Sequence, residues 1–196
     1  GGVVTGGTAS AAAALTPMDI IPCPAGGFTP TAKVLTQPGV TYSSTSGVLK
    51  ITSGTLTLTD TAYFFSSIVM TGGSTKLAFP GTSHANVVLR DSINVGTSTI
   101  VNSSMNATEL SFASCGTSAT PAYWALSSVG TASYFSVYAP NHIVYELGGG
   151  DFYGAVVASI YYAQGGGKYH YDAALARQAS NKTAVQLGSW AQLPGS

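Results

Sequence analysis

The sequence predicts an all-β protein whose main body is a right-handed parallel β-helix, a β-solenoid with coils of about 17–20 residues. Three observations support this prediction. Short strand-like runs follow one another from residue 47, a unit of fixed length recurs near the C-terminus, and the composition favours strands over helices. We expect an extended or loop segment over residues 1–46, the solenoid body over 47–171, and a C-terminal cap with a short helix over 172–196.

The composition is poor in charge and rich in strand-forming residues. Charged residues make up 7% of the chain, against about 25% in typical soluble proteins. The 23 Thr and 11 Tyr favour strands, whereas Glu, Lys and Arg, which favour exposed helices, are scarce. The net charge is zero and no Lys/Arg cluster occurs, which argues against nucleic acid or an anionic membrane surface as partner. Weak charge repulsion also permits self-association.

The first 46 residues are irregular, with prolines at positions 17, 22, 24, 30 and 38. Proline at this density predicts a strand or two followed by a long surface loop. No apolar run is long enough to span a membrane and no leader pattern is seen at the start, so we expect a mature or processed product without a membrane span. The uncharged segment 1–14 is expected to add as a strand to a neighbouring subunit.

Short runs with strand propensity begin at Val48 and are separated by Gly, Ser and Asp. Runs of this length with turn residues between them predict many short strands. They are 48–51, 55–59, 64–70, 76–79 and 87–89.

Two consecutive units of 17 residues, 134–150 and 151–167, match in aromatic, aliphatic and glycine positions. Matching residues at one fixed period predict stacked coils, because each coil buries its inward side chains on its neighbours. Alternation places Phe135, Val137 and Ala139 on the inward face. The predicted structural ladder is Phe135, Phe152 and Tyr169, with the pairs Ile143 and Ile160, and Tyr145 and Tyr162.

Each unit ends in three glycines: Gly148, Gly149 and Gly150, then Gly165, Gly166 and Gly167. We interpret them as tight corners that need positive φ. A ligand cradle is the alternative, but no helix start follows them and phosphate-loop spacing is absent.

Cys23 and Cys115 are the two cysteines, and neither has a second thiol nearby, which excludes CxxC motifs. A disulfide and two free thiols both remain open. A disulfide would close a loop of about 90 residues, with about 4 to 5 kcal/mol of stabilisation as an upper guide, and would imply an oxidising compartment. At the C-terminus, Asp172 is expected to begin a short capping helix and Trp190 to form its apolar plug.

Several segments of the C-terminal half match a known bacterial domain. They are 63–73, 92–96, 138–141, 149–155, 170–177 and 189–190. On these segments the chain resembles the glycine-rich repeat region of PilX-type pilus-assembly proteins and related bacterial envelope proteins of unassigned function. The resemblance covers roughly residues 60–190, and it implies a right-handed parallel β-helix with no assigned catalytic residues. The family's N-terminal apolar helix is not seen in this sequence.

Few residues suggest catalysis. His170 and Asp172 share one face of a strand, and such a pair can orient a general base, but we interpret Asp172 as the N-cap of the short helix. His84 and His142 have no partner at metal-ligand spacing and are expected to face solvent. The seven carboxylates are scattered, so no catalytic, cofactor or metal site is expected.

Four tyrosines, Tyr134, Tyr138, Tyr153 and Tyr161, have outward parity. They predict either a contact face for glycan or protein, or stacked ladders that stabilise the coils. We expect a secreted, non-catalytic structural protein of the bacterial cell surface, a subunit of an extracellular filament, pilus-associated or envelope assembly. A glycan-binding adhesin module is the alternative, and a β-helix carbohydrate-active enzyme is a third.

Overall fold

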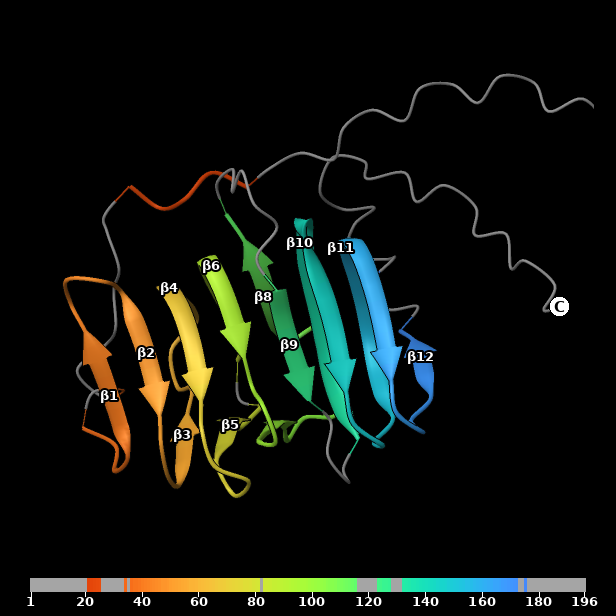
Figure 1. Ribbon diagram of the computed structural model, residues 1–196, viewed down its shortest axis with the longest axis horizontal. Helices are drawn as coiled ribbons and strands as arrows, with labels where there is room; N and C mark the ends of the chain where they lie inside the picture. Colours follow the sequence, from red (N-terminus) through yellow and green to blue (C-terminus); the bar gives the residue numbers. More distant parts are fainter. Residues whose placement is uncertain are drawn as a thin grey trace, which may run out of the picture.

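The computed structural model describes residues 21–25, 34, 36–81, 83–115, 123–127, 132–172 and 175. These residues form a parallel β-solenoid of about five turns, so the predicted fold class is confirmed (Figure 1). Its strands are β1 (Val40–Ser43), β2 (Val48–Ile51), β3 (Thr55–Thr57), β4 (Ala62–Met70), β5 (Lys76–Phe79), β6 (Ala85–Asn94), β7 (Thr99–Asn102), β8 (Leu110–Ser114), β9 (Tyr123–Ser127), β10 (Ser133–Leu147), β11 (Phe152–Gln164) and β12 (Tyr169–Tyr171).

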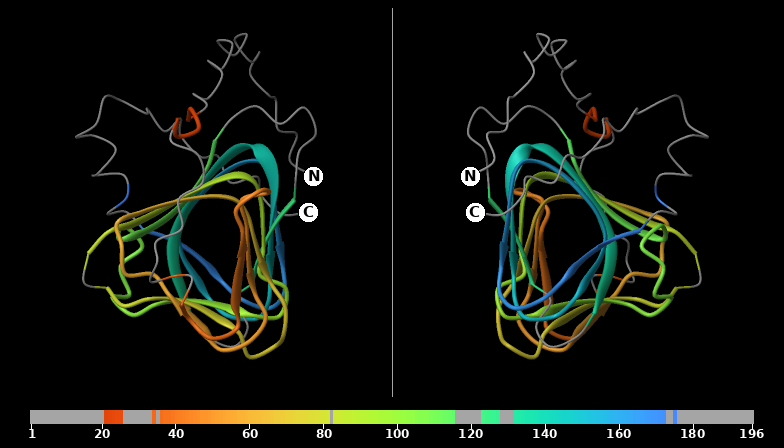
Figure 2. Two further views of the ribbon diagram at one scale, coloured as in Figure 1. Left: turned by 90° about the vertical axis from the view of Figure 1, so that its left-hand side faces the viewer. Right: turned by 90° about the vertical axis from the view of Figure 1, so that its right-hand side faces the viewer.

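Two sheets enclose the core. The larger has the order β1-β2-β4-β6-β8-β10-β11-β12, with β9 beside β6 and β10, and the smaller has the order β3-β5-β7. The larger sheet bends at a corner, marked by register shifts between Phe65 and Ser67 in β4 and between Ala139 and Ile143 in β10. Its two halves and the smaller sheet make three faces, and the coils stack around a closed cross-section (Figure 2).

The corner changes which residues of a long strand point inward. In β10, Phe135 and Val137 are buried before the corner, and His142 and Val144 are buried after it. Ile143 and Tyr145 therefore face outward, and their partners Ile160 and Tyr162 are 43% and 44% exposed. Both pairs are aligned between neighbouring coils, as predicted, and they lie on the outward face because alternation does not continue unchanged through the corner.

The predicted alignment of Phe135 with Phe152, by contrast, is wrong by two residues. Phe135 pairs with Gly154, 19 positions later, whereas Ile143 pairs with Ile160, 17 positions later, because β10 has two more residues than β11 at the corner. The rings nevertheless form one internal column. Ring centroids are 5.4 Å apart for Phe112 and Phe135, 4.9 Å for Phe135 and Phe152, and 5.3 Å for Phe152 and Tyr169.

Coil length differs between the two ends. In residues 48–115, the wide coils, a strand residue pairs with one up to 25 positions later, and three successive strands β3, β5 and β7 build the third face. In residues 132–171, the narrow coils, four residues, 148–151, connect β10 to β11 in place of such a strand. The wide coils reach further to one side in the end-on view (Figure 2).

In the described part of the predicted N-terminal segment, residues 21–25, 34 and 36–46, the strand is β1, which pairs antiparallel with β2. The predicted assembly strand 1–14 and Trp190 lie outside the described residues. Of the predicted cap, the main-chain N–H of Asp172 donates to the Gly154 carbonyl (3.0 Å), and that of Leu175 donates to the Asp172 carbonyl (3.1 Å).

Candidate functional site

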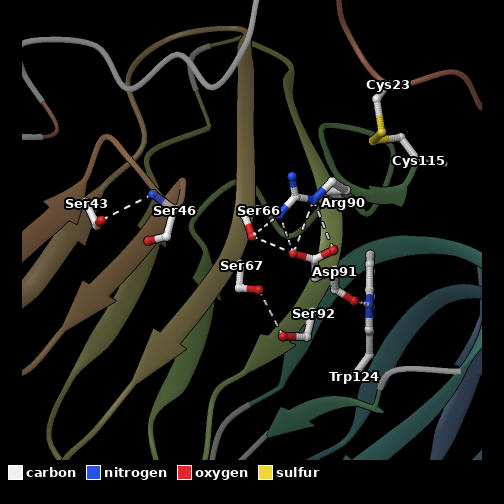
Figure 3. Close-up of polar contacts among 10 residues, drawn as sticks. All are labelled: Cys23, Ser43, Ser46, Ser66, Ser67, Arg90, Asp91, Ser92, Cys115 and Trp124. Atoms are coloured by element: carbon white, nitrogen blue, oxygen red, sulfur yellow. Dashed lines mark hydrogen bonds and ion pairs between the residues drawn. A yellow bond between two sulfur atoms is a disulfide. The ribbon is translucent and has the colours of Figure 1, made fainter. Parts of the chain in front are cut away.

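A polar cluster lies at the corner where β4 and β6 bend (Figure 3). Arg90 Nη2 donates to Asp91 Oδ2 at 2.9 Å and to Ser66 Oγ at 3.2 Å, and the Ser66 hydroxyl donates to Asp91. The bonds from Arg90, with a smaller contribution from Ser66, lower the pKa of Asp91 despite partial desolvation. The sequence does not predict this cluster, because no pattern in it places Ser66 one coil before Asp91.

His142 is fully buried beneath this corner, so the prediction that it faces solvent is wrong. Its ring packs on Trp124 with centroids 5.4 Å apart, and Trp124 Nε1 donates to the Asp91 carbonyl at 3.2 Å. Burial lowers the pKa of His142, and the adjacent Asp91 only partly opposes this shift. Neither ring nitrogen has a well-formed hydrogen bond within the described part of the chain. His84 is exposed.

The corner brings together a hydroxyl, a carboxylate and an imidazole, but not in the order that nucleophilic catalysis requires. A nucleophilic serine must donate its proton to a base, usually an imidazole oriented by a carboxylate. Here Ser66 donates to a carboxylate whose pKa is lowered, which makes that carboxylate a weak base. The arrangement ties two coils together. Among the described residues, no three His, Cys, Asp or Glu side chains form a group able to hold a metal.

Of the four predicted contact tyrosines, the structure brings Tyr134 and Tyr153 together. Their rings stack 4.7 Å apart with 15° between planes, and His170 stacks on Tyr153 at 4.3 Å and 8°. Tyr138 is half-buried on the same strand as Tyr134, with the same outward parity. Tyr161 packs against the core from inside, so it does not share this face. The parity change at the corner explains this difference.

A second outward column consists of Tyr123, Tyr145 and Tyr162, with centroids 5.5 Å and 5.0 Å apart. In both columns the middle ring is flanked by rings of the neighbouring coils. A sugar binds an aromatic side chain through the ring face. The terminal rings, Tyr123 and Tyr162 in one column and Tyr134 and His170 in the other, therefore each have a face that no described ring occupies.

His170 lies near Asp151, with Nε2 and Oδ2 3.5 Å apart. Asp151 Oδ1 also accepts a hydrogen bond of 2.9 Å from the Lys168 main-chain N–H. That bond is the largest cause that lowers the pKa of Asp151, and His170 adds to it. The Asp151 carboxylate thus closes the turn that follows the second triple glycine.

Cys23 and Cys115 form a disulfide (Figure 3). Ile21 also makes an isolated parallel bridge with Cys115. Phe64 and Val88 pack with Cys115 in a small cluster beside the main core. The disulfide therefore attaches the N-terminal segment to the residue that directly follows β8.

The solenoid has open strand edges at both ends of its described part. No described strand pairs with the outer side of β1, and none pairs with β11 beyond its contact with β12 at residues 152–154. Core residues are only partly covered there: Val40 and Tyr42 at the first end, and Val156, Ala158 and Tyr161 at the second.

The chain matches no protein-family model, no curated protein and no solved structure. The resemblance to PilX-type proteins therefore stays a prediction. Within the described ranges, no helix has the length and apolar character needed to cross a membrane.

Proposed function

We propose that this chain is a non-catalytic structural protein of the bacterial cell surface, a subunit of an extracellular filament, pilus-associated or envelope assembly. The observation that supports it most is a body of stacked coils whose described strands leave one sheet edge unpaired at each end, over a partly covered core. Unpaired strand edges are templates for pairing with another chain.

Two further features agree with an extracellular assembly. The disulfide between Cys23 and Cys115 fits an oxidising compartment. Only 7% of the residues are charged and the net charge is zero, so little repulsion opposes contact between copies.

Electron microscopy and analytical ultracentrifugation of the full chain test this proposal. We expect assemblies whose size rises with protein concentration, because association at open edges follows mass action. A chain that stays monomeric at every concentration, with its disulfide intact and both with and without residues 176–196, contradicts the proposal.

Glycan binding is the second candidate, favoured by the outward tyrosine columns. The ring of Tyr162 is 44% exposed at the end of its column, which leaves one face for a sugar. We expect Tyr162→Ala to abolish glycan binding if this surface is an adhesin site, measured by calorimetry on carbohydrates that the native chain retains. His170→Ala tests the terminal ring of the other column. Tyr161→Ala is the packing control, since Tyr161 points inward.

A carbohydrate-active enzyme requires paired carboxylates. The described carboxylates of Asp91 and Asp151 are instead held by Arg90, Lys168 and His170. The structure offers this third function no specific support.

A further inference from the structure

We propose that copies of this chain join head to tail, with β1 of one copy pairing antiparallel with residues 160–164 of β11 in the next. This inference rests on the proposed function and names the partner, a second copy, and the surface. It places the contact between copies at β1 and at the β11 end of the solenoid, whereas the sequence predicted an assembly strand only in the segment 1–14.

Both edges belong to one continuous face of the larger sheet. The row of paired residues begins at Tyr162 of β11, which pairs with Tyr145 of β10, and Tyr145 pairs with Ala125 of β9. Ala125 in turn pairs with Asn94 of β6, and Asn94 pairs with Val69 of β4. From β4 the face continues through β2 to β1. A second copy stacked in line therefore brings its β1 against β11. Since β1 is the antiparallel strand, the new pair is antiparallel.

The main-chain groups at both edges point toward the junction. The Gln164 carbonyl accepts from Gly148 N on the β10 side (3.0 Å), so alternation directs the N–H and C=O groups of Tyr161 and Ala163 to the opposite side. In β1, the Gly39 carbonyl accepts from Thr52 N and the Ser43 carbonyl from Gly47 N. Alternation thus directs the groups of Tyr42 away from β2.

The side chains at the two edges also complement one another. Tyr42 and Tyr161 both point inward and pack only partly against the core. Opposite residues of an antiparallel pair share one face, so Tyr42 next to Tyr161 or Ala163 extends the core across the junction. Natural edge strands are commonly protected by charged residues or proline. Neither residues 40–43 nor residues 158–164 contain one.

Such a contact joins two different surfaces, so it repeats without closing unless the copies rotate into a ring. The geometry points to a filament in which the larger sheet runs from copy to copy. At each junction, β11 of one copy and β1 of the next lie one strand spacing apart, about 4.8 Å.

Engineered cysteines test this geometry in the full chain. Within one copy, Thr41 and Gln164 are separated by six strand spacings, about 29 Å, which is too far for a disulfide. We expect oxidised T41C/Q164C, or T41C/Y162C in the other register, to form a reducible series of linked oligomers. T41C alone stops at dimers. T41C/K76C, which moves one thiol to the third face, gives at least about tenfold fewer species longer than dimers.

A second pair of variants tests the main-chain contact. Ala163→Pro removes an N–H from the free edge, and Ala163→Ser keeps it. We expect Ala163→Pro to shorten or abolish the assemblies and Ala163→Ser to preserve them, with both folded by circular dichroism.

Two results overturn the inference. Assemblies that form normally while neither cysteine pair yields oligomers longer than dimers exclude the head-to-tail contact but leave the proposed function standing. A monomeric chain that assembles only after deletion of residues 176–196 shows that its own C-terminal segment occupies the β11 edge. A monomer with or without that segment contradicts the proposed function itself.

Discussion

The wide and the narrow coils close their cross-section around the core in two different ways. The wide coils build a third face from β3, β5 and β7, whose Leu56, Leu77 and Ile100 are fully buried. The narrow coils replace that face with a glycine turn and fill their interior with the rings of Phe135, Phe152 and Tyr169. Parallel stacking thus tolerates a change in coil circumference, provided that the sheet shared by both regions continues.

The two regions also differ in what holds each coil to the next on the outside. At the corner of the wide coils, Ser66 and Arg90 bond to Asp91, and Ser92 bonds to Ser67. The narrow coils carry stacked tyrosine rings instead. Aromatic stacking adds about 0.5–1.5 kcal/mol per pair beyond burial, whereas exposed ion pairs contribute about 0–1 kcal/mol. A stacked pair such as Tyr145 and Tyr162 is therefore expected to contribute at least as much as the exposed ion pair of Arg90 and Asp91.

The largest loss of stability is expected from removing the disulfide of the wide coils. Cys23 and Cys115 are separated by 92 positions, and the loop-entropy model gives about 4–5 kcal/mol for a loop of this size. We expect Cys23→Ser/Cys115→Ser to lower the free energy of unfolding by about 4 kcal/mol, measured by urea denaturation. Reduction of the native chain should reproduce the loss. A loss below about 1 kcal/mol would show that the stacked coils hold this end without the link.

The second effect concerns the glycine turns of the narrow coils. Gly165 has φ +133°, and a Cβ there would lie 1.9 Å from the Gly148 carbonyl oxygen, whereas a Cβ on Gly166 meets nothing within 4 Å. We expect Gly165→Ala to cost on the order of 3 kcal/mol through backbone strain and clash. Gly166→Ala is the matched control and should change stability by less than about 0.5 kcal/mol. Equal losses for the two variants would contradict stacked glycine corners.

The sequence predicts the narrow region better than the wide one. Gly148 and Gly165 recur at one spacing, and the long strands around them follow from the repeated aromatics. The third face is harder to predict, because its coils share neither a length nor a sequence pattern: residues of β3 pair with residues of β5 that lie 21 positions later, and residues of β5 pair with residues of β7 that lie 23 positions later. The corner was missed for a physical reason: an irregularity between Ala139 and Ile143 exchanges inward and outward parity. Tyr145 and Tyr161 consequently face the opposite way from a uniform alternation.

The smallest effect on stability is expected where the wide and narrow coils meet within one chain, because His142 of β10 packs there on Trp124 of β9. Burial lowers the pKa of His142 below its ordinary 6.5, so this imidazole binds a proton more weakly in the folded chain than in the unfolded chain. Stability is therefore complete above about pH 6.5 and falls below it, by at most about 1.4 kcal/mol per pH unit for one site. Asp91 faces the ring, and its pKa is lowered, so it stays ionised over this window.

His142→Phe removes the titrating group while retaining a ring against Trp124. We expect the fall in urea midpoint between pH 7 and pH 5 to become shallower in this variant by up to one proton's contribution. His84→Phe changes an exposed histidine and should keep the native slope. Identical slopes in all three proteins would mean that the imidazole at the junction titrates alike in the folded and unfolded chains. In that case water reaches the place where the wide coils meet the narrow ones.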